Sequence, residues 1–263
     1  MRFAILGSGS RGNATVVSAG STRLLVDCGF SRRETDARLA RCGIGGDDLS
    51  GILVTHEHAD HISGVMRLSR AYELPVYLTR GTALAAGLDL EPACQQISPH
   101  RAFRLGEIEV QPYPVPHDAR EPVQFVLTAG GCRLGILSDA GAVTAHMRKV
   151  LSGCDALLLE CNHCPEMLAE GPYPVSLKRR VGGIHGHLNN GQSASLVSAI
   201  ELGFPHDFLE SKGVSKNVRG WSGEGGGGLY TKSKIYQSDK IGKNPTFLGA
   251  SSLVFNHFKS LLL

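Results

Sequence analysis

The chain has 263 residues, 42% of them hydrophobic, and a formal net charge of +3 at pH 7. This length allows one large domain or two small ones, and so mild a charge does not by itself indicate binding to nucleic acid or a membrane. The sequence shows no run of 18 apolar residues and no signal-peptide pattern, and its seven cysteines are irregularly spaced, so we expect a cytoplasmic protein with reduced thiols and no membrane partner.

The first part of the chain predicts an antiparallel meander. Apolar runs at 3–6, 14–17 and 23–26 are typical of short strands. The glycine-rich segment 7–13 between the first two runs favours a structural turn. A phosphate cradle is the alternative, although the segment lacks the Lys-Ser/Thr ending of a P-loop. The arginine-rich segment 31–43 predicts an amphipathic surface helix.

The densest chemistry lies at residues 55–61, which read Thr-His-Glu-His-Ala-Asp-His directly after a short apolar strand. His56 and His58 are two positions apart, so in an extended segment they point the same way and can hold one metal ion. Asp60 and His61 follow where the chain turns into a helix, and they can hold a second ion. These ligands suit zinc and related divalent ions, and two ions about 3.5–4 Å apart can act on both oxygens of a hydrolysis.

Strands and helices alternate through the rest of the chain, which predicts an α/β protein. The predicted helices are 62–72, 79–88 and 192–202, and the predicted strands are 75–78, 108–110, 124–127, 133–137 and 156–159. The strands 124–127 and 133–137 are expected to pair as a hairpin through two glycines.

The pattern HxHxDH after a strand ending in Ile-Leu-Val-Thr resembles the metallo-β-lactamase superfamily of metal-dependent hydrolases. The resemblance implies a four-layer αββα sandwich with the metal ions at the edge of the two sheets. Asp139 and His187 are only 48 positions apart, which leaves no room for the large inserted domain of the RNA-cleaving relatives. We therefore expect a single domain.

The same resemblance assigns further site residues. It makes His117 the third ligand of the first ion and Asp139 the carboxylate that contacts both ions. It places Asp27 beneath the metal ions, where it supports the histidine loop. Glu160 and His163 are expected at the floor of the cleft.

Three further motifs, ECNHxxEML, GPYPxxLKxR and GHLxN, look like the YycJ/WalJ-type branch, which is implicated in acting on DNA as an exonuclease. By resemblance His187 is a general acid or a phosphate ligand. Lys178, Arg179 and Arg180 either steer a phosphate backbone or form a solvated basic helix face. Asn189 is assigned to substrate binding, although these proteins usually have serine there.

The composition changes near residue 205. Up to Phe204 there are 17 Arg and 2 Lys, and after it 1 Arg and 7 Lys. We interpret residues 1–204 as the hydrolase domain and 205–263 as an atypical, mobile tail outside the ancestral domain. The family's last strand, whose histidine completes the second metal site, is absent where it is expected. His257 is the better replacement and His206 the weaker one, and the third possibility is that nothing replaces it.

The sequence thus predicts a nuclease or phosphodiesterase that acts on DNA with two divalent ions, zinc or manganese, with iron as a further possibility. Asp60 and Asp139 orient the attacking water, and His187 protonates the leaving oxygen. One alternative is a hydrolase of a small ester, thioester or lactam at the same site. The other is a metal-binding protein whose altered C-terminus impairs catalysis.

Overall fold

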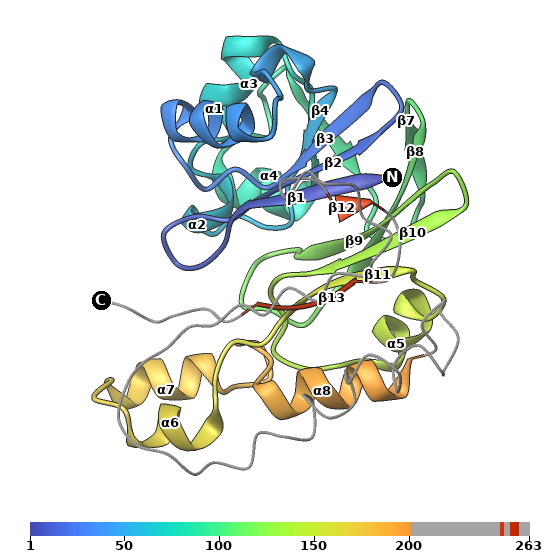
Figure 1. Ribbon diagram of the computed structural model, residues 1–263. Helices are drawn as coiled ribbons and strands as arrows, with labels where there is room; N and C mark the ends of the chain where they lie inside the picture. Colours follow the sequence, from blue (N-terminus) through green and yellow to red (C-terminus); the bar gives the residue numbers. More distant parts are fainter. Residues whose placement is uncertain (201–247, 250–252, 258–263) are drawn as a thin grey trace.

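Two mixed β-sheets pack face to face in the computed structural model, which describes residues 1–200, 248–249 and 253–257 (Figure 1). From edge to edge, the first sheet contains β12 (Leu248–Gly249), β1 (Arg2–Gly7), β2 (Ala14–Ala19), β3 (Thr22–Val26), β4 (Gly51–Leu53), β5 (Val76–Thr79) and β6 (Cys94–Ile97). The second contains β13 (Leu253–His257), β11 (Ala156–Glu160), β10 (Cys132–Leu137), β9 (Val123–Ala129), β8 (Ile108–Pro114) and β7 (Phe103–Leu105).

Helices cover the outer face of each sheet (Figure 1). The first sheet carries α1 (Arg32–Arg41), α3 (Val65–Tyr72) and α4 (Arg80–Ala86), and the second carries α5 (Ala145–Leu151) and α8 (Asn190–Ala199). The remaining short helices are η1 (Gly46–Asp48), α2 (Ala59–Ile62), α6 (Pro165–Glu170) and α7 (Val175–Val181). This arrangement confirms the predicted αββα sandwich without a large insertion.

The alternation of side chains along β3 shows how the layers form. Leu24 and Val26 point between the two sheets, whereas Leu25 points to the helices on the outer face. The second sheet supplies Phe125 and Leu127 to the shared layer. Because neighbouring residues of a strand face opposite ways, one apolar run fills two cores at once.

Some predicted elements differ in the structure. The predicted helix 62–72 is interrupted, since Ile62 ends α2 and α3 begins at Val65. Between them the Gly64 N–H donates to the Cys28 carbonyl oxygen at 2.8 Å, outside the helix, and a Cβ at Gly64 would lie 1.9 Å from the Phe30 carbonyl oxygen. The helix predicted over 192–202 begins earlier, at Asn190, because the Asn189 side chain caps it. It also ends earlier than predicted, at Ala199, because Ile200 adopts an extended conformation.

Some elements were not predicted, namely β6, β7, β12, η1, α5 and α6, and α7 was considered only as a basic helix face at residues 178–180. Strand β6 reads Cys-Gln-Gln-Ile and lies half-exposed at the sheet edge, so it lacks the apolar pattern that predicts a strand. Strand β7 alternates apolar and polar residues, but over three residues only.

The described part of the C-terminal segment adds one edge strand to each sheet. Strand β12 pairs with β1, and β13 runs parallel to β11 with His257 opposite Glu160. The predicted domain boundary at residue 205 and the candidate ligand His206 lie outside the described residues.

The topology brings the carboxyl ends of several strands to one edge of the sandwich. Strands β3 and β4 are parallel neighbours in the first sheet, and β10 and β11 are parallel neighbours in the second. Strand β8 runs in the same direction as β10, because both are antiparallel to β9. Loops after such strand ends are the usual place for a site.

None of the seven cysteines forms a disulfide bond. None of the helices in the described part of the chain is long and apolar enough to cross a membrane.

Candidate metal centre

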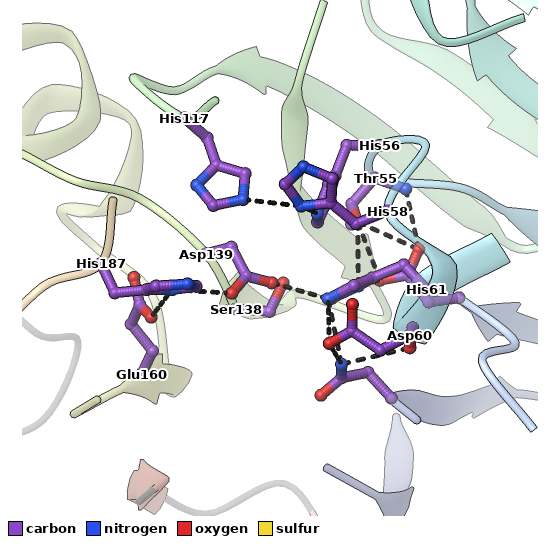
Figure 2. A network of polar contacts seen from close by, with 12 residues as sticks. Thr55, His56, His58, Asp60, His61, His117, Ser138, Asp139, Glu160 and His187 are labelled. Atoms are coloured by element: carbon purple, nitrogen blue, oxygen red, sulfur yellow. Dashed lines mark hydrogen bonds and ion pairs between the residues drawn. The ribbon is translucent and has the colours of Figure 1, made fainter. Parts of the chain in front are cut away.

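Three imidazoles converge at this edge of the sandwich (Figure 2). His56 and His58 follow β4 in the first sheet, and His117 follows β8 in the second. Nε2 of His56 and Nε2 of His117 lie 3.0 Å and 3.2 Å from Nδ1 of His58. The three rings therefore form a group that could hold one metal ion.

The opposite nitrogens of these rings are held by hydrogen-bond acceptors. Nε2 of His58 donates to the Asp118 carbonyl oxygen at 3.2 Å, and Nδ1 of His117 donates to the Gly186 carbonyl oxygen at 2.9 Å. Burial lowers the pKa of His117 to about 4 and that of His56 well below its usual range, so these rings are neutral. A neutral imidazole has a single N–H, so the converging nitrogens carry lone pairs, as metal ligands require.

Asp27 lies beneath the histidine loop and is almost completely buried. Its carboxylate accepts hydrogen bonds from the Thr55 backbone N–H and from Nδ1 of His61, both at 2.8 Å. The Thr55 hydroxyl donates to the same carboxylate at 2.8 Å and accepts from Nδ1 of His56 at 2.9 Å. A single carboxylate thus orients two rings of the loop, one directly and one through Thr55.

A second group surrounds Asp139, which follows β10 and is 1% exposed. Nε2 of His61 lies 2.8 Å from Oδ2 of Asp139, and Nδ1 of His187 lies 3.0 Å from Oδ1 (Figure 2). The residues that could hold a metal ion here are His56, His61 and Asp139, or His117, Asp139 and His187. Both sets contain Asp139, and each also contains one imidazole of the first group, His56 or His117. Asp139 therefore joins the first group, which is one half of the centre, to the second group, which is the other half.

Asp60 lies at the mouth of this second group. Its Oδ2 is 3.6 Å from Nε2 of His61 and accepts a hydrogen bond from the Asn13 side chain at 3.0 Å. The Asn13 backbone N–H also donates to the Asp60 carbonyl oxygen at 2.7 Å. The glycine-rich turn that ends at Asn13 therefore packs against the metal loop, which supports the structural interpretation of this turn.

The Glu160 carboxylate fixes the position of the His187 ring. One Glu160 oxygen accepts from the backbone N–H groups of Ala140 at 2.6 Å and Leu188 at 3.2 Å, and the other lies 3.1 Å from Nδ1 of His187. Burial opposes the charged form of His187, but the hydrogen bonds and charges of Asp139 and Glu160 outweigh it and raise the His187 pKa to about 9. His187 is therefore a protonated ring held by carboxylates.

The donor set fits divalent metal ions. The first group offers three imidazole nitrogens, which suit zinc and similar ions. In the second group, burial alone would lower the pKa of His61, but Asp139 and Asp27 raise it to about 10. The carboxylates of the second group thus favour a positive charge there.

Other predicted site residues make contacts outside these two groups. His163 forms a backbone bridge with Asn189, and its Nδ1 is buried without a hydrogen-bond partner in the described part of the chain. The Asn189 side chain caps α8 by accepting from the Gln192 N–H at 2.9 Å. Lys178 donates to the Ala169 carbonyl oxygen at 2.6 Å. Each of these residues has a structural contact, and their assignment to substrate or catalysis stays a prediction.

Four participants in the centre were missed in the sequence: Asn13, Thr55, Asp118 and Gly186. Thr55 opens the histidine stretch and Asp118 directly follows His117, so adjacency to a ligand was the available signal. Gly186 acts through a backbone carbonyl, which leaves no trace in residue type.

Replacing Asp27 with asparagine is expected to lower metal affinity about 10- to 100-fold, because two rings lose a charged acceptor. Asparagine has the same shape and tolerates the φ of +60° found at Asp27. The thermal unfolding midpoint of the chelator-treated protein is expected to fall, because Asp27 also stabilises the charged form of the buried His61, so metal affinity is compared well below both midpoints. Affinity is measured by competition with a chromophoric chelator, with Asp47→Asn at an exposed position as the control. Equal affinity in the wild type and Asp27→Asn would contradict the role.

Comparisons with known proteins agree with this geometry. Residues 22–203 match the family described as "Beta-lactamase superfamily domain". The chain is 36% identical to exodeoxyribonuclease YycJ of Bacillus anthracis, over 83% of this chain and 85% of that protein. It is 33% identical to exodeoxyribonuclease WalJ of Streptococcus pneumoniae, over 74% and 75% of the two chains.

The fold also matches a solved structure, the metallo-β-lactamase fold protein YhfI from Bacillus subtilis. The TM-score is 0.60 at 16% identity, with 80% of this chain and 90% of that chain covered. The sequence match, this fold and the histidine and aspartate groups agree with one another, and the family implies divalent metal ions. The chain belongs to the β-lactamase superfamily domain family and has the metallo-β-lactamase fold.

Proposed function

We propose that the chain is a metal-dependent exonuclease that hydrolyses phosphodiester bonds of DNA. The observation that carries the proposal is the continuous centre around Asp139, in a chain that aligns over most of its length with proteins named exodeoxyribonucleases. A nucleic acid, DNA, is accordingly the proposed substrate.

The proposed centre holds two divalent ions, zinc or manganese, with iron as a further possibility. His56, His58 and His117 hold the first ion, and Asp60 and His61 hold the second. Asp139 lies between them, which is supported by its place in one set with His56 and in another with His117, two residues of the first group. When bound, the ions lower the pKa of water and withdraw charge from the phosphate oxygens.

A candidate for the last ligand of the second ion is His257. It ends β13, and its backbone lies in register with Glu160 at the carboxyl end of β11. Glu160 contacts His187 in the second group, so the backbone of His257 lies at the end of the sheet where this group is found, which supports the proposal. Residues 1–204 form the proposed catalytic domain, which the family match over residues 22–203 supports. The cytoplasm is the proposed compartment.

The protein's own groups orient the reactants. The carboxylates of Asp60 and Asp139 accept hydrogen bonds from the attacking water and direct it at the phosphorus. Nδ1 of His187 faces the carboxylates of Asp139 and Glu160, so the Nε2 proton is the one that reaches the leaving oxygen. Glu160 and His163 support this end of the centre.

Substrate binding is assigned to Lys178, Arg179, Arg180 and Asn189. The three cations lie on α7, whose chain leads directly into the loop before His187. A phosphate backbone that follows this helix would reach the metal centre, and cations beside phosphates provide the sequence-independent part of binding.

The test is metal content per chain by mass spectrometry, together with manganese-dependent cleavage of a 5′-phosphorylated duplex DNA. We expect two ions per chain and cleavage that a chelator abolishes. Rising salt should raise KM for DNA steeply, whereas hydrolysis of a neutral ester would respond little to salt. One ion or none, with no cleavage, would reject the nuclease and favour a protein impaired by its altered C-terminus. Salt-insensitive hydrolysis of p-nitrophenyl acetate without DNA cleavage would favour the small-ester hydrolase.

A further inference from the structure

The Arg180 side chain contacts a different part of the protein from its neighbours on α7. Its Nε donates to Oδ2 of Asp118 at 2.5 Å. Lys178 instead binds the Ala169 carbonyl oxygen, and Arg179 is exposed and makes no ion pair with the described residues. Among the contacts that the described residues show for these three cations, only that of Arg180 reaches the loop that carries His117.

The Asp118 carboxylate reaches the imidazole group itself. Its Oδ1 lies 3.6 Å from Nε2 of His58 and 3.5 Å from Nε2 of His117. This one anion is therefore bounded by the Arg180 guanidinium on one side and by the metal-group rings on the other. A phosphate could occupy the place of this carboxylate, because guanidinium groups bind carboxylates and phosphates in the same paired geometry.

The backbone around Arg180 is fixed relative to the centre. The His187 N–H donates to the Val181 carbonyl oxygen at 2.9 Å, and the Gly186 carbonyl oxygen accepts from His117. Gly186 also packs so closely that a Cβ there would lie 2.1 Å from the Arg180 carbonyl oxygen. The end of α7 therefore keeps its place when the side chain changes its partner.

The contact between the two side chains is open to exchange. The side chain of Arg180 is 57% exposed and that of Asp118 is 30% exposed, so an anion from solvent can reach both. Because the Arg180 guanidinium already donates to the Asp118 carboxylate, a phosphate from solvent must compete with this carboxylate for the guanidinium.

We propose that Arg180 binds the phosphate next to the bond that is cut, and that Asp118 is the carboxylate which this phosphate displaces. The proposal rests on the nuclease function proposed above. It gives the two residues opposite effects: Arg180 favours DNA binding, and Asp118 opposes it by occupying the same guanidinium.

The test uses the full chain loaded with manganese and a 5′-phosphorylated duplex whose terminal linkages are phosphorothioates, which keep their charge and resist cleavage. Fluorescence anisotropy gives Kd at several salt concentrations. Arg180→Ala is expected to weaken binding about tenfold and to reduce the slope of log K against log salt by about one. Asp118→Asn keeps the shape of the side chain, removes its charge and is expected to tighten binding severalfold.

Arg41→Ala is the control, because Arg41 is also an exposed arginine in the last turn of a helix. It should change neither Kd nor the salt slope. If the ion pair were only structural, Asp118→Asn would weaken binding as Arg180→Ala does, and that result overturns the proposal. Wild-type protein that binds and cuts DNA while Arg180→Ala binds equally well also overturns it. Wild-type protein that neither binds nor cuts DNA overturns the nuclease function, and this proposal with it.

Discussion

Replacing Asp139 with asparagine is expected to reduce DNA cleavage about 10³-fold, the order found when one electrostatic group of an active site is removed. Asparagine preserves the shape of this buried side chain but removes the negative charge that faces His61 and His187. Metal content should fall from two ions to one, because Asp139 belongs to both sets of the second group, whereas His56, His58 and His117 form the first group without it. Mass spectrometry and cleavage of the same purified sample give both quantities.

Asp89→Asn provides the matched control for Asp139→Asn, since Asp89 is exposed and lies far from these groups in the sequence. It should cleave and bind metal as the wild type does. An Asp139→Asn protein with two ions and wild-type cleavage would show that Asp139 does not join the two halves of the centre.

Replacing His187 with alanine is expected to lower kcat about 10²- to 10⁴-fold on DNA, the usual contribution of a positioned proton donor. The loss should be far smaller with thymidine 5′-(p-nitrophenyl phosphate), because p-nitrophenolate leaves without a proton. Steady-state rates on both substrates distinguish the two roles considered for this residue. A phosphate ligand would lose the same factor on both.

His185→Ala is the control for His187→Ala, because His185 is an exposed histidine two positions away. It should retain wild-type kcat on both substrates. A His187→Ala protein with unchanged kcat on DNA would exclude the proton-donor role.

The sequence predicted the fold and most of the centre because the necessary information was local. The apolar run 23–26 fills two layers in alternation and is directly followed by Asp27, which supports the histidine loop. The histidine stretch carries four of the proposed ligands within seven residues. The distant members, His117 and Asp139, were found by resemblance, since composition does not predict that the ends of β8 and β10 meet β4.

The sequence could not predict which side chains contact one another between distant segments. The contact between Asp118 and Arg180 joins residues 62 positions apart, and no pattern in either segment points to the other. The same is true of Asn13, which reaches Asp60 across the sandwich edge. Glu160 and His187 were both expected in the cleft, but the hydrogen bond between them depends on how β11 and the loop after α7 are packed.

The residues that we propose as ligands come from both sheets: His56, His58, Asp60 and His61 follow β4, and His117 and Asp139 follow β8 and β10. A metal ion held by this set links two halves of the chain that otherwise adhere through apolar side chains. Metal affinity and the association of the halves are then thermodynamically coupled, since ligands from only one half form an incomplete set. Slippage of one sheet relative to the other, even without unfolding, separates the ligands and releases the ion. The bound metal thus reports on the assembly of the whole sandwich as well as on the state of the active centre.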